Sequence, residues 1–392
     1  MNKKSLLLFP FLGLLLCISC ASTFKLKKIG TEDVSGWKSF RGDTKNIGCV
    51  SAITPTPDKL LWKYDLNRPV KATPIVMRSM VVIGSLDKRL SFVDAASGGE
   101  LGYYKIYSSV STSVCADEGT VYFGWYNFKE SLFALNIEKK QVRWKVSLGD
   151  ISASPNIKGD IIFVGTGDGS MWALEKTTGR EIWQFKSQSP VLSTPACLDD
   201  SVSGEDDSLS LRVNEETIYF GSTDGFLYAL QAKNGKLNWK FKTAGGIYSS
   251  PAIHAGMIFF GSVDGYLYAL FLKDGSLAWK FKTGEGIYSS PAVTESLVYI
   301  GSNDYCMYAV NQKTGELSWK FKTGGLVHSS PIAVGDELFF GSYDSNFYVL
   351  NRFTGELLWK YQTKGMISSS PAYYNGRIYI GSEDGYLYCF GR

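Results

Sequence analysis

A repeat of 40 residues is the feature that most constrains the fold of this chain. One copy, residues 245–283, reads GGIYSSPAIHAGMIFFGSVDGYLYALFLKDGSLAWKFKT. Its tryptophan and its proline recur in step along the C-terminal half, at Trp239, Trp279, Trp319 and Trp359 and at Pro251, Pro291, Pro331 and Pro371. A period of about 40 residues is typical of a propeller blade when each copy holds four strands.

Each copy has the pattern of four short strands. The runs IYSSPAI, MIFFGS, YLYALF and SLAWKFKT are rich in β-branched and aromatic residues. An Asp-Gly pair separates the second run from the third, and a second glycine turn separates the third from the fourth. Such pairs favour tight hairpins because glycine accepts a positive φ. No stretch has a sustained helical period, so each copy is predicted to be an antiparallel meander.

Counting the copies predicts an all-β, eight-bladed propeller over residues 59–392. The aromatic residue of the fourth strand is expected at Trp62, Tyr103, Trp144, Trp183, Trp239, Trp279, Trp319 and Trp359. The strand around Trp62 has no preceding partners, and the last copy ends without a fourth strand. We therefore expect the strand around Trp62 to complete the last blade, which leaves no unpaired terminal edge.

The N-terminal residues have the pattern of a secretion signal. Lys3 and Lys4 precede an apolar run, Leu6–Leu16, that is too short to span a bilayer. Residues 1–19 resemble a bacterial lipoprotein signal with Cys20 as the lipidated residue, and the absence of an acidic residue after Cys20 favours an outer membrane lipoprotein that faces the periplasm. An ordinary cleaved signal and an uncleaved anchor are the alternatives. Residues 20–36 are predicted to be a tether and residues 37–58 a strap across the ring.

Charge, histidines and cysteines exclude several classes of function. Removal of Lys3 and Lys4 with the signal leaves 39 basic and 37 acidic residues, a balance that predicts no nucleic-acid partner. His254 and His328 have no partner at metal-ligand spacing, so no metal site is expected. Five further cysteines are an odd number and form no disulfide framework. The acidic insertion at residues 199–214 does not have the spacing of a calcium loop.

The fourth-strand segments carry a family resemblance. The segment ALQAKNGKLNW, residues 229–239, is similar to the tryptophan-docking motif of quinoprotein-like (PQQ-repeat) propellers, and four more copies occur at residues 173–183, 269–279, 309–319 and 349–359. The resemblance implies an eight-bladed propeller with one of two kinds of function. One is dehydrogenation with pyrroloquinoline quinone (PQQ) and calcium. The other is non-enzymatic scaffolding, as in BamB-like outer-membrane assembly lipoproteins.

The innermost strands favour the scaffold. A quinoprotein site needs carboxylates as calcium ligand and catalytic base, and the eight first-strand segments contain no Asp or Glu. Only loop residues such as Asp150 and Glu285 remain as ligands for the dehydrogenase alternative. We therefore expect no cofactor, and we expect envelope proteins as partners, among them outer-membrane assembly components. The protein is expected to be a monomer within such a complex.

Two sets of residues are candidates for binding. The first is a polar and aromatic ring at the channel mouth, which suits a small polar ligand or a peptide; a water-lined channel is the alternative. It comprises Tyr248, Tyr288, His328, Ser249, Ser289, Ser329 and Ser369. The second is a basic rim on the outermost strands, predicted over blades five to eight, for an acidic partner or anionic lipid; lysines that prevent edge aggregation are the alternative. It comprises Lys240, Lys242, Lys280, Lys282, Lys320, Lys322 and Lys360.

Overall fold

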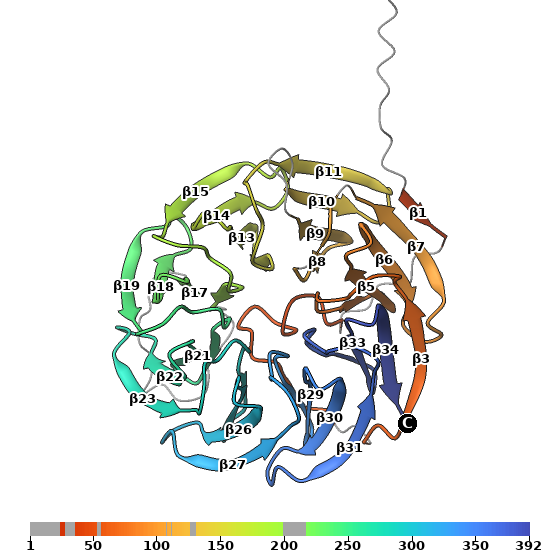
Figure 1. Cartoon of the computed structure of the whole chain (residues 1–392). Coiled ribbons are helices and arrows are strands. Elements are labelled where there is room, and N and C mark those ends of the chain that lie inside the picture. The colour runs from red at the N-terminus through yellow and green to blue at the C-terminus, as the bar shows by residue number, and fades with distance from the viewer. Residues whose placement is uncertain are drawn as a thin grey trace, which may run out of the picture.

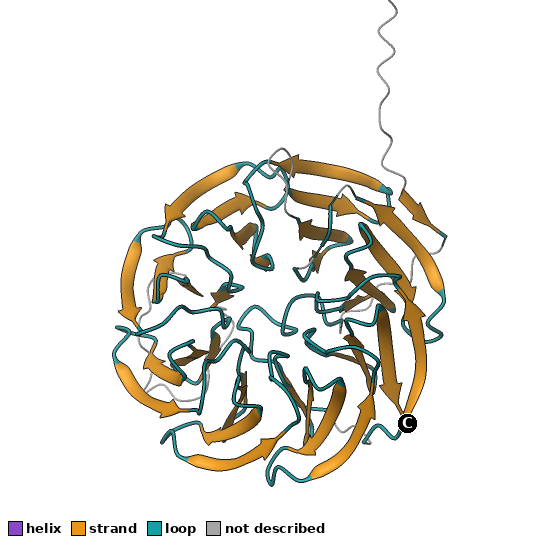
Figure 2. Cartoon of the chain, in the orientation of Figure 1, coloured by secondary structure: helices purple, strands orange, loops and turns teal. Residues whose placement is uncertain are grey.

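The computed structural model describes residues 24–27, 36–52, 56–106, 108–110, 112–125, 131–198 and 217–392. Within these ranges the chain forms strands, turns and loops and no helix, so no described helix has the length and hydropathy to cross a membrane (Figure 2). The predicted signal (residues 1–19), Cys20 and the acidic insertion (residues 199–214) lie outside the described residues.

Eight antiparallel sheets stand around a central axis, which confirms the predicted propeller (Figure 1). In each blade the first strand is innermost and the fourth is outermost. Blade one contains β4 (Ile75–Met77), β5 (Met80–Gly84), β6 (Arg89–Asp94) and β7 (Glu100–Lys105). Blade two contains β8 (Cys115–Asp117), β9 (Thr120–Gly124), β10 (Leu132–Asn136) and β11 (Gln141–Val146). Blade three contains β12 (Asn156–Lys158), β13 (Ile161–Gly165), β14 (Ser170–Glu175) and β15 (Glu181–Lys186). Blade four contains β16 (Ala196–Cys197), β17 (Thr217–Gly221), β18 (Phe226–Gln231) and β19 (Leu237–Lys242).

The second half of the ring repeats the same order. Blade five contains β20 (Ala252–His254), β21 (Met257–Gly261), β22 (Tyr266–Phe271) and β23 (Leu277–Lys282). Blade six contains β24 (Ala292–Val293), β25 (Leu297–Gly301), β26 (Cys306–Asn311) and β27 (Leu317–Lys322). Blade seven contains β28 (Ile332–Val334), β29 (Glu337–Gly341), β30 (Asn346–Asn351) and β31 (Leu357–Gln362). Blade eight contains β32 (Ala372–Tyr374), β33 (Arg377–Gly381), β34 (Tyr386–Gly391) and β3 (Lys59–Asp65).

The ring closes where the sequence predicts it to close. Strand β3 pairs antiparallel with β34, and Trp62 stands opposite Cys389. The C-terminal blade is therefore completed by a strand from near the N-terminus (Figure 1).

The hydrophobic core lies between neighbouring blades, and tryptophans hold the joints. Trp279 of blade five is 9% exposed, and its indole N–H donates to the backbone oxygen of Gln312 in blade six at 3.1 Å. Gly315 in the same turn packs on the indole face, and a Cβ there would lie 2.7 Å from the ring. Corresponding indole bonds to the next blade are made by Trp144, Trp183, Trp239 and Trp319. Burial of such large side chains stabilises these joints.

Blade one departs from this arrangement, and the structure corrects two predictions there. The register of β6 and β7 places Gly102, not Tyr103, at the docking-tryptophan position. The segment predicted to be a tether contains β1 (Phe24–Leu26), which pairs antiparallel with β7 as a fifth strand. A Cβ on Gly102 would lie 1.8 Å from the backbone oxygen of Lys25, so glycine is required for this close approach.

The strap crosses the centre of the ring at one end of the channel (Figure 1). Its backbone oxygens accept hydrogen bonds from inner-strand N–H groups of successive blades, for example Ile253 to Lys45 and Val293 to Ile47, both at 3.0 Å. The short strand β2 (Cys49–Val50) then pairs parallel with β28. Arg41 is 1% exposed and donates to the backbone oxygens of Pro291 and Pro331. The strap therefore connects blades that are far apart in the sequence.

Candidate functional site

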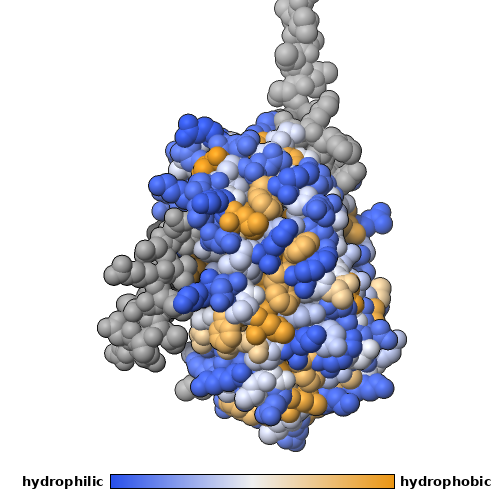
Figure 3. All heavy atoms as spheres, turned by 90° about the vertical axis from the view of Figure 1, so that its left-hand side faces the viewer, coloured by the Kyte–Doolittle hydropathy of each residue, from blue (hydrophilic) through white to orange (hydrophobic). Residues whose placement is uncertain are grey.

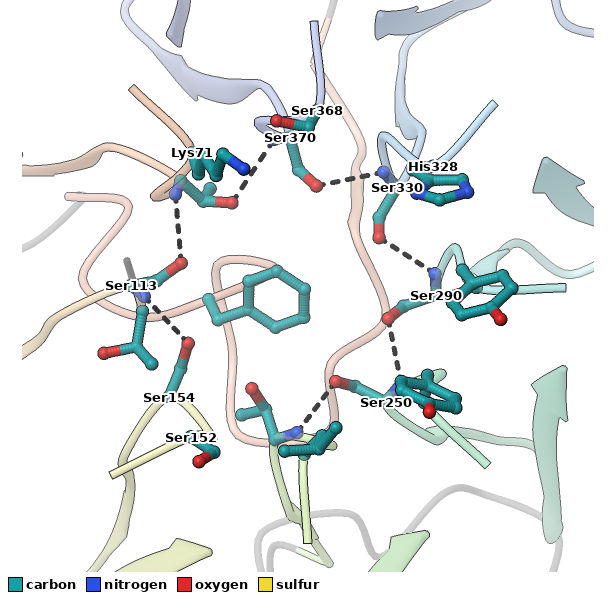
Figure 4. Close-up of a pocket in the computed structure, with 17 residues that line it drawn as sticks. Lys71, Ser113, Ser152, Ser154, Ser250, Ser290, His328, Ser330, Ser368 and Ser370 are labelled. Atoms are coloured by element: carbon teal, nitrogen blue, oxygen red, sulfur yellow. Dashed lines mark hydrogen bonds between the residues drawn. The ribbon is translucent and has the colours of Figure 1, made fainter. Parts of the chain in front are cut away.

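A ring of hydroxyl groups lines the central channel. In each blade a serine or threonine stands two residues before the innermost strand. In seven of the eight blades the hydroxyl oxygen of this residue accepts the backbone N–H of the equivalent residue in the preceding blade (Figure 4). The bonds are 2.8–3.4 Å long and join Thr73 to Ser113, Ser113 to Ser154, Thr194 to Ser250, Ser250 to Ser290, Ser290 to Ser330, Ser330 to Ser370, and Ser370 to Thr73. Because these seven hydroxyl oxygens accept hydrogen bonds, the hydrogen of each hydroxyl is left to be donated.

The serines predicted to line the channel do not do so. Ser249, Ser289 and Ser329 are all 0% exposed, one residue before the hydroxyls that line it. Ser289 Oγ donates to the backbone oxygen of Gly301 and accepts its N–H, at 3.0 and 2.8 Å, and so ties the inner segment to the second strand. Ser369 is likewise buried and donates to the backbone oxygen of Ala72. Successive residues of an extended segment point to opposite sides, which accounts for the difference.

The predicted aromatic residues do come together, at one side of the channel mouth (Figure 4). The Tyr248 and Tyr288 rings are 4.8 Å apart, and the Tyr288 ring stacks on His328 at 4.9 Å. His328 is held by Asn303 at Nε2, 2.8 Å away, and by the Tyr343 hydroxyl at Nδ1, 2.9 Å away. Burial lowers the pKa of His328, so the neutral imidazole is favoured. The sequence pattern does not indicate Asn303 and Tyr343. Both lie in hairpin turns, and only the fold brings these turns next to His328.

The cavity is a cup with a volume of about 230 Å³. Phe40 of the strap lines it at one end, and residues from all eight blades form its wall. Lys71 is the one lysine, and no aspartate or glutamate is present, among the described residues that line it. The wall is therefore rich in hydrogen-bond donors.

The cup does not fit a quinone held by calcium. Calcium takes six to eight oxygen ligands with carboxylates among them, and the described lining has none. Within the described residues, no group of three or more His, Cys, Asp or Glu is placed to hold a metal. Asp150 and Glu285 come from joints on different parts of the ring and are not among the lining residues. Burial raises the pKa of Asp150. His254 ends β20, away from the described lining, and burial lowers its pKa.

The basic rim is present, but its first lysines belong to blade four rather than blade five. Lys240 and Lys242 lie on β19, which pairs with β18, because the fourth strand completes the blade that precedes it. Their ammonium groups lie 4.4 and 4.6 Å from the centre of the Phe226 ring. Lys280 and Lys282 clasp Tyr266 in the same way, at 4.6 and 4.5 Å. These lysines thus pack on aromatic rings of their own blade.

The rim changes character along blades six and seven. Lys320 and Lys322 lie on β27, where Cys306 takes the position of the ring that the lysines clasp in blades four and five. Lys360 on β31 is followed by Gln362 rather than by a second lysine. The outer strands also expose a leucine at their first position, ahead of the lysines, as at Leu277 and Leu317. On the side of the ring that carries β19, hydrophilic and hydrophobic residues are interspersed (Figure 3).

Comparison with known proteins agrees with this architecture. A family model described as outer membrane protein assembly factor BamB matches residues 93–244 and 207–286. BamB of Nitrosomonas eutropha is 24% identical over 233 residues, 58% of this chain and 54% of that protein, so the chain matches about half the length of this relative. The quinohemoprotein alcohol dehydrogenase ADH IIB of Pseudomonas putida is 26% identical over 50% of this chain and 24% of its own length.

Solved structures show the same fold. The crystal structure of BamB from Moraxella catarrhalis has a TM-score of 0.72 at 20% identity, over 85% of this chain and 99% of that one. A europium-containing methanol dehydrogenase has a TM-score of 0.75 at 12% identity, over 92% of this chain and 98% of that one. The chain is thus a PQQ-repeat propeller of eight blades. Within that class it is related to BamB.

Proposed function

We propose that this protein is a lipid-anchored scaffold of the bacterial envelope that assists the assembly of outer-membrane proteins, as the names of its BamB relatives indicate for those proteins. The observation that supports the proposal best is the lining of the central cup. A propeller whose strap is bound to its inner strands, and whose described cup is lined by hydroxyl and aromatic groups without a carboxylate, has the form of a binding module. In this proposal Cys20 carries the lipid, and the propeller faces the periplasm.

Its partners in this proposal are outer-membrane assembly components, bound through the loops and outer strands of the ring. The experiment is affinity capture of the full-length, tagged protein from detergent-solubilised envelopes. Capture of a barrel-assembly component, with a weaker yield from the Cys20→Ala variant, is the expected result. Recovery of the protein without any such component would refute the assembly role. Equal membrane association of Cys20→Ala and the unmodified chain would refute the anchor alone.

Dehydrogenation is the competing function and has its own assay. The purified protein would be incubated with PQQ, calcium, alcohols or sugars, and an electron-accepting dye. We expect no turnover above the background of protein without PQQ, because the described cup offers no carboxylate to act as base or calcium ligand. Turnover that depends on PQQ would show that loops outside the cup supply those groups.

A second candidate function, binding of a small polar ligand, is favoured by the cup itself. Hydroxyl donors ring the cavity, and Tyr248, Tyr288 and His328 offer ring faces on one side. Thermal-shift measurements with a panel of monosaccharides and small carboxylates test this function. A ligand of the cup should stabilise the unmodified protein but not Tyr288→Leu. It should still stabilise Tyr305→Leu, because Tyr305 is an exposed tyrosine that is not part of the described lining.

A further inference from the structure

The joint between blades one and two is built around the N-terminal strand β1. Three residues there differ from the regular joints. Gly102 takes the place of the docking tryptophan, and Phe92 pairs with it where blades two to six have alanine. Lys140, at φ 52°, takes the turn position where other blades have the glycine that packs on the indole. The joint therefore lacks both halves of the usual tryptophan–glycine contact.

β1 supplies what the joint lacks. The Phe24 ring lies 5.6 Å from Phe92 and 5.8 Å from Tyr104, and Leu26 is 5% exposed. The Lys140 ammonium group donates to the backbone oxygen of Leu26 at 2.7 Å. Lys140, in the turn of blade two, thus binds β1, the strand that is paired with blade one. All three departures have one common explanation, which is that this joint is shaped to hold β1.

This arrangement fixes where the N-terminal end of the described chain leaves the ring. Strand β1, which begins at Phe24, lies at the outer edge of blade one, and its Leu26 is bound by Lys140 in the turn between β10 and β11 (Figure 1). Cys20 precedes Phe24 by four residues, and four residues of extended chain reach at most about 14 Å. A lipid on Cys20 would therefore hold the outer edge of blades one and two within that distance of its anchor point.

The same edge carries exposed positive charge. Lys25 and Lys27 lie on or beside β1, and Lys105, Lys139 and Arg143 lie on β7, the blade-two turn and β11. None of the five has an ion-pair partner among the described residues. Anionic headgroups attract basic residues that lie within about one Debye length, roughly 8 Å at physiological ionic strength. Two exposed carboxylates lie on the same edge, Glu100, which accepts from the Tyr64 hydroxyl, and Glu138, which pairs with Arg78. The five basic residues outnumber them, so the edge is net positive and complementary to an anionic lipid surface.

We propose that the outer edge of blades one and two is the membrane-facing side of the propeller, with β1 as the clamp that sets its orientation on an anionic lipid surface. The proposal rests on the lipid anchor at Cys20. In this orientation blades five and six, on the opposite side of the ring, point away from the membrane. Their outer strands are then the ones presented to partners.

Quenching of a fluorophore by lipid tests this orientation. The full-length, lipidated protein, with Cys49→Ser to remove the half-buried thiol, is reconstituted in vesicles of phosphatidylethanolamine and phosphatidylglycerol that contain a quencher lipid. The fluorophore is attached at Gln141→Cys in blade two or at Glu316→Cys in blade six. Both residues are exposed and stand three residues before the docking tryptophan. We expect quenching to remove most of the fluorescence at 141 and little at 316.

Two glycine variants test the clamp. Gly102→Ala puts a methyl group on the Lys25 backbone oxygen and should release β1, which trypsin cleavage at Lys25 and Lys27 would report. The difference in quenching between 141 and 316 should then disappear while the vesicle-bound fraction stays unchanged. Gly149→Ala is the control, because a Cβ there meets nothing within 4 Å, and it should keep the difference.

The outcomes separate the two proposals. Equal quenching at 141 and 316 in vesicle-bound, unmodified protein would overturn the orientation and leave the anchor intact. Failure of the unmodified protein to bind vesicles would overturn both. If the difference persisted in Gly102→Ala after β1 had been released, the clamp would not set the orientation, and the proposal would be wrong.

Discussion

The joints of this propeller fall into two kinds. Between blades five and six, Trp279 spans the gap, donates to Gln312 and is covered by Gly315. Between blades one and two, the separate strand β1 packs in the gap. Its Leu26 is buried, its Phe24 is partly buried, and Lys140 donates a hydrogen bond to its backbone. These two joints share an aromatic side chain that packs in the gap and a hydrogen bond across it. The two joints differ in which part of the chain supplies the aromatic side chain and the hydrogen bond.

The largest effect is expected when the tryptophan side chain is removed from a regular joint. Trp279→Ala removes the indole and should lower the free energy of unfolding by about 3–5 kcal/mol. Trp279→Phe should cost less, because it keeps most of the apolar contact and loses the hydrogen bond to Gln312. Urea unfolding followed by circular dichroism measures both. Equal losses for the two variants would show that packing contributes little to the joint.

The glycine that covers the indole should matter less than the indole itself. A Cβ at Gly275 would lie 2.5 Å from the Trp239 ring, and its φ of 70° is unfavourable for other residues. Gly275→Ala should therefore cost about 1–3 kcal/mol. Gly149→Ala, with a φ of 86° and open space around it, reports the backbone contribution alone. If Gly275→Ala and Gly149→Ala lose the same stability in thermal unfolding, the new methyl group does not clash with the Trp239 ring.

The irregular joint should be the easiest to loosen locally. Lys140→Met removes the donor to the Leu26 oxygen and should weaken the docking of β1 by about 1 kcal/mol, while the melting temperature of the ring stays the same. Hydrogen exchange at Lys25 and Leu26 measures the opening. Lys139→Met, an exposed neighbour without an ion pair among the described residues, is the control. Similar exchange rates in both variants would show that the Lys140–Leu26 hydrogen bond does not hold β1 in place.

The smallest effect is expected from the histidine of the cup. Burial lowers the pKa of His328 in the folded protein, so the unfolded chain binds a proton more readily. Stability is then complete above the unfolded pKa of about 6.5 and falls as the pH drops toward the folded value. In His328→Gln, the melting temperature should fall less between neutral and mildly acidic pH than it does in the unmodified protein. Because His254 has the same direction of shift, His254→Gln gives the size of its separate contribution.

The sequence predicts the ring well and individual side-chain positions less well. The 40-residue spacing and the orphan strand around Trp62 are enough to predict eight blades and their closure, because both follow from strand count alone. The difference between Tyr103 and Gly102 comes from register, which the bulge between Phe92 and Val93 sets. In the Ser-Ser pairs, composition cannot tell which serine faces the axis. β1 is three residues long, too short for a periodic signal, and its partners lie about 80 residues away.

The pairing of β3 with β34 has a consequence for biogenesis. These strands lie at opposite ends of the ring-forming chain, with Lys59 paired to Gly391. A polypeptide is synthesised from its N-terminus onward, so β3 must wait, without its partner β34, until the last blade has been made. Contacts so distant in sequence form slowly and leave strand edges open meanwhile. A truncation that removes only β34 should therefore leave an open ring with two unpaired edges, which proteases would degrade.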